Sequence, residues 1–182
     1  KENGFAILVN QTNGKLWATH IPLYFEPENN QLHGHLSIEN PQATAFKNND
    51  EVLAIFQGNH AYISSSWYDH ENVPTWNYIA VHVYGKIKVL SNDETILHLK
   101  KLVDKYEASQ ENPLKVENLS KKTMMQSRGI IGIEIQITSI EAKKKLSQNR
   151  DDKNYTAIIS KLDNSKDFQS KAIAEQMRKN RF

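Results

Sequence analysis

The sequence contains no cysteine and few glycines, and both shortages limit what the protein can do. Its 182 residues include seven glycines and no cysteine. The absence of thiols excludes disulfides, thiolate zinc sites, iron–sulfur clusters and cysteine nucleophiles. The glycines form no Gly-x-Gly-x-x-Gly or Gly-x-x-x-x-Gly-Lys pattern, so a glycine-rich phosphate loop is not expected. Gly-x-Ser-x-Gly and His-Glu-x-x-His motifs are absent as well.

A large excess of charge and long apolar runs are missing too. The 23 basic and 21 acidic side chains give a formal charge of +2. This near-balance disfavours a protein whose main task is to neutralise nucleic-acid backbones. No apolar run approaches the roughly 20 residues of a membrane helix, and no secretory signal is recognisable. We therefore expect a cytoplasmic protein that does not enter the membrane.

The first ninety residues are typical of β structure. Apolar or alternating runs predict strands at 5–9, 15–23, 32–36, 52–56, 61–64 and 78–90. Asn13-Gly14 favours a hairpin between the first two strands, and the polar segment 57–60 predicts a turn. Asn40 before Pro41 is typical of a helix start and predicts a short helix over residues 41–48.

The second half of the chain is mainly helical. Ser91 and Glu94 fit a capping box, which predicts a helix up to Glu107, followed by a second helix over 116–125. Strict alternation from Ile131 predicts a half-buried strand over 129–140, and helices are expected at 151–162 and 165–179. Strands grouped before helices favour an antiparallel β-barrel or sandwich with attached helices.

The domain organisation follows from this order of elements. We expect a mainly β domain over residues 1–150, with peripheral helices and a helical insertion at about 91–127. A C-terminal helical tail over residues 151–182 would form an appendage to this domain.

Histidines are the first candidates for a functional site. His20, His33 and His35 fall on two predicted strands, and alternation places His33 and His35 on the same face. Such a pair could supply two metal ligands. However, no aspartate or glutamate lies close by in sequence to complete a ligand set. Hydrogen-bonded wall histidines are therefore the simpler interpretation, and no metal site is predicted.

Aromatic residues are concentrated between positions 62 and 84, where Tyr62, Trp67 and Trp76 are interleaved with hydroxyl and amide residues. Aromatic side chains with a polar tip suit a planar ligand or a subunit interface. The same residues could instead fill the interior of the barrel. Both interpretations remain open from the residues alone.

Six motifs in a fixed order carry a resemblance that covers nearly the whole chain. They are Trp17-Ala-Thr-His-Ile-Pro22, Leu32-His-Gly-His-Leu36 with Asn40-Pro-Gln42, His60-Ala-Tyr-Ile-Ser-Ser-Ser-Trp-Tyr68, Val73-Pro-Thr-Trp-Asn-Tyr78, Val81-His-Val-Tyr-Gly85 and Lys145-Leu-Ser-Gln-Asn-Arg150. Together they resemble the PaiB-type family of FMN-binding negative transcriptional regulators. One departure is Ser65, where the family has a proline, so the loop before Trp67 is less constrained.

The resemblance implies an FMN-binding split β-barrel that works as a homodimer, with the flavin in the groove between subunits. It also implies repression of sporulation and degradative-enzyme genes. Two alternatives stay open, namely a flavin-dependent oxidoreductase of the pyridoxamine-phosphate-oxidase-like class and a haem-binding split barrel. No arginine precedes Arg128, which weakens the oxidase reading because those relatives hold phosphates with arginine-rich strands.

The cofactor would need a strand edge for the flavin ring and donors for the phosphate. The predicted cofactor-binding residues are Ala18, Thr19, His20, Ile21, Pro22, His33, Gly34, His35, Asn40, Pro41, Gln42, Tyr62, Ser64, Trp67, Thr75, Trp76, Asn77, Lys145 and Arg150. Catalytic residues are not assigned. No helix-turn-helix is recognisable, so any effect on DNA is expected to be indirect or to use the basic C-terminal helices.

Overall fold

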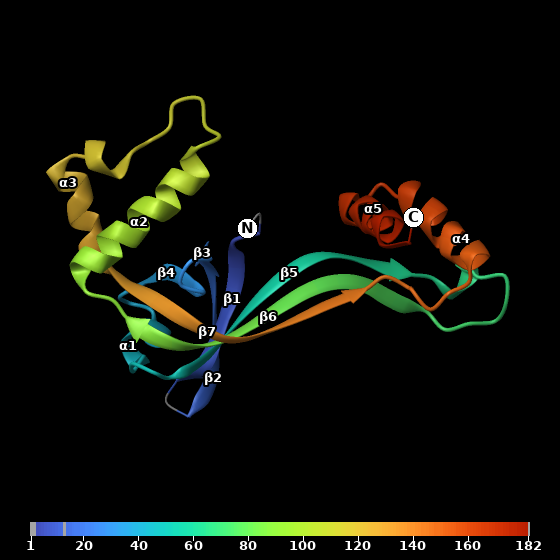
Figure 1. Ribbon diagram of the computed structural model, residues 1–182, viewed down its shortest axis with the longest axis horizontal. Coiled ribbons are helices and arrows are strands. Elements are labelled where there is room, and N and C mark those ends of the chain that lie inside the picture. The colour runs from blue at the N-terminus through green and yellow to red at the C-terminus, as the bar shows by residue number, and fades with distance from the viewer. Residues whose placement is uncertain (1–2, 13, 182) are drawn as a thin grey trace. The chain divides into compact units, whose positions relative to one another are not determined.

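The computed structural model describes residues 3–12 and 14–181. Within these residues seven strands form one sheet with the order β2-β1-β5-β6-β7-β4-β3 (Figure 1). The strands are β1 (Phe5–Thr12), β2 (Lys15–Pro22), β3 (Tyr24–Glu26), β4 (Gln31–Ser37), β5 (Glu51–Ile63), β6 (Thr75–Val89) and β7 (Ile130–Lys145). The helices are α1 (Pro41–Ala45), α2 (Asn92–Glu107), α3 (Lys121–Met124), α4 (Asp152–Asp163) and α5 (Phe168–Arg181), with 3-10 turns η1 (Ser65–Trp67), η2 (Val116–Asn118) and η3 (Met125–Gly129). This confirms the predicted mainly β architecture with peripheral helices.

Contacts between residues divide the chain into two compact units. Unit 1 comprises Lys1–Phe56 and His82–Ile140, and unit 2 comprises Gln57–Val81 and Glu141–Phe182. The long strands β5, β6 and β7 contribute residues to both units. The expected division of the sequence at residue 150 stays a prediction.

Unit 1 begins with a hairpin whose two strands pair along their whole length. The register runs from Phe5 opposite Pro22 to Thr12 opposite Lys15. Gly14 in the connection has a φ of 77°, a left-handed conformation that glycine adopts without steric cost. The predicted hairpin is confirmed in this respect, while Asn13 lies outside the described residues.

A close approach at Gly34 brings strands β2 and β4, from opposite sides of the strand order, together within unit 1. Strands β2 and β4, which are far apart in the hydrogen-bonded order, contact each other. A side chain at Gly34 would place its Cβ only 2.7 Å from Leu23 Cδ2 and 2.9 Å from the Pro22 carbonyl oxygen. The missing side chain therefore lets the sheet curl toward closure, as a barrel requires.

The pairing of β4 with β7 separates an apolar face from a polar one. Leu32 lies opposite Ile135 and Leu36 opposite Ile131, whereas His33 lies opposite Glu134. Ile133 and Ile135 are fully buried, so the alternation predicted from the sequence is confirmed. Helix α2 begins at the predicted capping box and contacts β4.

Two predicted elements are wrong. Strand β5 is continuous where a turn was expected at 57–60, because Gly58 packs against Ile79 of β6 and the polar run is part of the sheet. The helix expected over 116–125 is broken into η2, α3 and η3. Ser120 accepts a hydrogen bond from the Thr123 amide and starts a new short helix there.

Unit 2 has its own apolar core, to which α4 and α5 supply most of the side chains. The core includes Ile63 from β5, Leu146 after β7, and Tyr155, Ile158 and Ile173 from the two helices. The expected C-terminal helices are thus confirmed as packed elements. In the part of the chain that the structure describes, no helix has the length and apolar character that crossing a membrane requires.

Candidate functional site

Strand β2 supplies the sheet edge that the sequence predicts for a flavin ring. It lies at one end of the strand order and pairs with β1 on one side. Ala18 and His20 are exposed, Thr19 and Pro22 are half-buried, and Ile21 is buried. An edge strand presents N–H and C=O groups that the sheet leaves unpaired, and a heterocycle can use them. Four of the five predicted residues of this edge keep some exposure, whereas Ile21 is buried and β4 packs against the Pro22 end.

The segment around α1 is anchored to the sheet by polar side chains. Asn40 Nδ2 donates to Thr19 Oγ1 at 2.9 Å, which ties the start of α1 to β2. The fully buried Gln42 donates from Nε2 to the Leu8 carbonyl oxygen at 3.1 Å and to Asn10 Oδ1 at 2.9 Å. Its Oε1 is buried without a hydrogen-bond partner. Gln42 thus holds α1 on β1 and retains one unused acceptor.

The start of α1 has fewer free hydrogen-bond donors for a phosphate than the sequence suggested. Asn40 Oδ1 already accepts the Gln42 amide at 2.9 Å, and the Asn40 carbonyl accepts the Ala43 amide at the same distance. Pro41 has no N–H to donate. A phosphate at this position would have to displace the Asn40 cap, and Thr19 and His20 on β2 are the more accessible donors.

His33 lies inside unit 1, and its side chain is only 1% exposed. Its Nε2 is 3.3 Å from a carboxylate oxygen of Glu26. Burial, assisted by the neighbouring His98, lowers the pKa of His33 to about 4, so the ring is neutral at pH 7. Burial also lowers the pKa of the half-buried His35. A neutral, buried imidazole beside a carboxylate is a weak partner for a phosphate.

Unit 2 gathers the predicted aromatic residues around the ends of β5 and β6. Trp76 is 52% exposed and meets Tyr62 edge to face, with ring centroids 5.8 Å apart. His60 lies 5.9 Å from the same indole ring. Trp67 is only partly buried and packs against the core of unit 2, while the preceding Ser64 caps η1. Trp76 and Tyr62 therefore form an accessible aromatic surface, and Trp67 is a wall residue.

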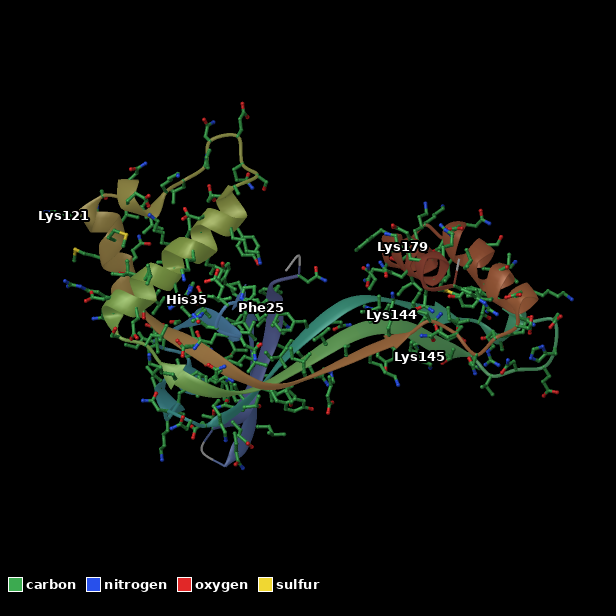
Figure 2. All side chains as sticks on the ribbon, viewed as in Figure 1. Phe25, His35, Lys121, Lys144, Lys145 and Lys179 are labelled. Carbon is green, nitrogen blue, oxygen red and sulfur yellow. The ribbon has the colours of Figure 1, made fainter. Side chains whose placement is uncertain are left out.

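The motif at 145–150 is a tight turn that leads from β7 into α4. Lys145, labelled with Lys144 in Figure 2, donates from Nζ to the hydroxyl of Thr75 at the start of β6. Ser147 has a φ of 59° and donates to Oδ1 of the fully buried Asn77 at 3.0 Å. This turn brings together the predicted residues Thr75, Asn77 and Lys145.

Arg150 ends the same turn in contact with an aromatic ring. Its guanidinium lies 5.0 Å from the ring centroid of Tyr68, an arrangement that favours a cation over a π face. The nearby Asp152 pairs with Arg181 at 2.6 Å. Arg150 is thus held by Tyr68 and keeps its charge available to a ligand.

Sequence reasoning did not single out Asn154, His98 and Glu134, which the fold brings into contact with polar residues of other segments. Asn154 on α4 accepts the Asp69 amide at 3.1 Å and donates to the Asp69 carboxylate at 2.9 Å. A hydrogen bond from Lys153, with others from His70 and Asn154, holds the pKa of Asp69 well below its usual value. His98 and Glu134 adjoin His33 in unit 1. Apart from the bond between the adjacent His70 and Asp69, these contacts join distant segments, and no local pattern could have indicated them.

Comparison with known families identifies the class of protein. Residues 1–139 match the family described as "Putative FMN-binding domain", so the chain belongs to this family. The flavocytochrome Anf3 from Azotobacter vinelandii has a TM-score of 0.62 and 15% identity, covering 85% of this chain and 68% of that chain. The FAD and heme binding protein from Mycobacterium smegmatis also has a TM-score of 0.62 and 15% identity, covering 85% and 71%. These likenesses confirm the predicted split β-barrel fold.

A named relative has a higher sequence identity to this chain than these two solved structures. The chain is 43% identical over 180 residues to the protease synthase and sporulation protein PAI 2 of Bacillus subtilis (strain 168), covering 97% of this chain and 87% of that protein. It is also 28% identical over 223 residues to the uncharacterized protein AN0679 of Emericella nidulans, covering 98% and 89%. The match to PAI 2 confirms the predicted membership of the PaiB-type family.

Proposed function

We propose that the protein binds FMN as a homodimer and acts in the cytoplasm as a negative regulator of sporulation and degradative-enzyme genes. The observation that carries this proposal is the 43% identity to PAI 2 along 97% of the chain. The name of that relative links it to protease synthesis and sporulation. The family match over residues 1–139 supports FMN as the flavin.

The residues present suit an FMN molecule in several respects. The β2 edge from Ala18 to Pro22 would face the polar edge of the ring, and Thr19 and His20 are accessible donors. In unit 2, described by itself, Trp76 and Tyr62 offer a separate exposed aromatic surface that suits a planar ring. When bound, FMN would supply reversible electron or hydride transfer. The chain's own residues would orient the ring and shield it from water.

The cations of unit 2 suit the phosphate of FMN better than those of unit 1. Lys145 is fixed by its hydrogen bond to Thr75, and Arg150 is oriented by Tyr68. In unit 1 the neutral His33 lies beside the carboxylate of Glu26. Taken unit by unit, Lys145 and Arg150 in unit 2 are therefore better donors for a phosphate than His33 and His35 in unit 1. The buried Asn77 would act through the turn it stabilises.

A second copy of the chain would cover apolar surface at the end of β7. Ile140 is 54% exposed, and the following residues 141–144 are exposed on both faces of the strand. A strand end with both faces in water gains little from side-chain packing, which supplies much of the stability of a strand. The homodimer, with flavin in the groove between subunits, is consistent with this exposure.

An indirect, ligand-sensing route suits the charge distribution better than direct binding to DNA through the C-terminal helices. Four cations near these helices already have carboxylate partners: Lys153–Asp69, Arg178–Asp163, Lys179–Glu175 and Arg181–Asp152. Cations that are paired within the protein release fewer counterions from a DNA backbone. The exposed Lys143 and Lys144 on β7 remain as candidates for a weak DNA contact.

Two experiments test the proposal. Titration with FMN, followed by quenching of flavin fluorescence, should saturate at one FMN per chain, and light scattering during gel filtration should give the mass of a dimer. A monomer that quenches no fluorescence would contradict it.

A low-salt mobility-shift assay separates the regulatory routes. Strong DNA binding by the wild type that is lost in the Lys143→Gln/Lys144→Gln variant would overturn the indirect route.

A further inference from the structure

A polar layer lies under helix α2, where an apolar one would ordinarily be expected. His33 on β4 and Glu134 on β7 are directly opposite each other in the strand register. His98 on α2 stacks on His33, with ring centroids 3.7 Å apart and ring planes 8° from parallel. Three elements that are distant in sequence thus place two imidazoles and a carboxylate side by side.

The imidazole groups of this layer lack the hydrogen bonds that buried polar groups normally make. Both ring nitrogens of His33 and Nδ1 of His98 are buried without a hydrogen-bond partner. Glu26 approaches His33 Nε2 to 3.3 Å, but outside hydrogen-bonding geometry. Leaving such groups unpaired costs their hydration without return, and native proteins seldom tolerate it. The arrangement therefore indicates a missing partner.

A small enclosed space adjoins the two histidines. A cavity of about 10 Å³ opens among His33, His35, His98 and Thr95, with Leu99 and Leu102 also in its lining and Glu134 outside it. Figure 2 shows His35 on β4 near α2. This volume is about that of a single water molecule or ion, and far too small for a flavin or haem. Close contact between α2 and β7 bounds the space, because a side chain at Gly132 would collide with Thr95 Oγ1.

We propose that His33, His98 and Glu134 bind one divalent transition-metal ion, for which Zn²⁺ is the best match. One ligand atom from each of the three residues lies within 4.8 Å of the other two. Two imidazoles and one carboxylate form a donor set that suits Zn²⁺, with a fourth position left for water. The site is independent of the flavin and has a different chemistry.

Metal binding requires one of the two stacked histidine rings to rotate. In a parallel stack the two rings cannot both direct a nitrogen lone pair at one ion, because the ion must lie close to both ring planes. His98 is half-buried while His33 is buried, so His98 is the ring that would have to turn. Metal ligation requires both imidazoles in the neutral form. The ion would join α2 to β4 and β7.

The test is isothermal titration of the full-length, EDTA-treated protein with Zn²⁺, with and without FMN. The wild type should bind one Zn²⁺ per chain in both states. The conservative variants Glu134→Gln and His98→Gln should weaken this binding by at least the 10–100-fold typical for the loss of outer-sphere partners. The matched control His70→Gln removes an exposed histidine beside Asp69 in unit 2 and should leave the affinity unchanged.

Equal Zn²⁺ affinity in all four proteins, or no saturable site in the wild type, would overturn the proposal. A second measurement needs no variant and covers the case in which one fails to fold. At a hundredfold excess over its dissociation constant, Zn²⁺ should raise the melting temperature of the wild type by about 5–10 °C. Mg²⁺, which prefers oxygen ligands, should not. Equal effects of both ions, or none, would contradict the site.

Discussion

Ser147 and Asn77 form a buried hydrogen bond that joins the turn after β7 to strand β6. Ser147 Oγ donates to Asn77 Oδ1 at 3.0 Å, and Asn77 Nδ2 lies 3.5 Å from Met177 Sδ on α5. Both the oxygen and the nitrogen of the Asn77 side-chain amide therefore contact residues of unit 2. This contact places Lys145 beside Thr75, and the proposed phosphate site depends on that placement.

Replacing Asn77 by alanine should destabilise unit 2, because it leaves the buried Ser147 hydroxyl without its acceptor. The expected loss in the free energy of unfolding is about 1–3 kcal/mol, measured by urea denaturation. The Ser147→Ala variant provides the control. The double variant should lose less than the sum of the two single losses, since both remove the same bond. Strictly additive losses would show that the two side chains are not coupled.

Gly34→Ala should destabilise unit 1 by about 1–3 kcal/mol, since overpacking forces neighbouring atoms apart. The new Cβ would lie 2.9 Å from the Pro22 carbonyl oxygen, and backbone cannot move aside as a side chain can. Gly129→Ala is the matched control, because no atom lies within 4 Å of its Cβ position. Thermal unfolding of both variants measures the difference. Equal melting temperatures would argue against the close approach of β4 to β2.

The capping box of α2 should make stability depend on pH in acid. The hydrogen bond from Lys88, with those from Ser91, lowers the pKa of Glu94 to about 2 from an ordinary 4.5. The unfolded chain then binds more protons between these values, so this stabilisation is complete above pH 4.5 and is lost as the pH falls toward 2. Melting curves should show the stability gap between wild type and Glu94→Gln closing over that range. A gap that stays constant with pH would contradict the assignment.

Lys145→Gln should weaken FMN binding by about tenfold, equivalent to about 1.4 kcal/mol. The ammonium group is lost, while the glutamine can still reach a neighbouring hydroxyl. Lys144→Gln serves as the control, because Lys144 is the adjacent exposed cation on β7. Fluorescence titration with FMN measures both affinities. If the two variants lose affinity equally, FMN binding depends on the overall charge of the protein and not on a specific contact with Lys145.

Features set by short sequence segments could be predicted from the sequence. The capping box at Ser91 involves residues three apart, and the alternation after Ile131 follows from the two-residue period of a strand. The turn expected at residues 57–60 was wrong because glycine and polar residues mark turns only when no partner strand is available. Here Gly58 packs against Ile79, and this tertiary contact overrides the local preference.

The sites were predictable only within single segments. The shared face of His33 and His35 followed from alternation, and the aromatic concentration near Trp76 was visible in the composition. The sequence suggested that no acidic residue accompanies His33, yet Glu134 lies opposite it across the sheet. His98 reaches the same place from α2. Strand register and helix docking decide such contacts, and local periodicity predicts neither of them.

The visible absorption spectrum of the purified protein, before and after denaturation, tests the central claim most directly. The account predicts a two-band flavin spectrum that persists through gel filtration, and FMN as the compound released by denaturation. A colourless protein that also fails to take up added FMN would contradict it. An intense Soret band would contradict it as well, by replacing the flavin with haem.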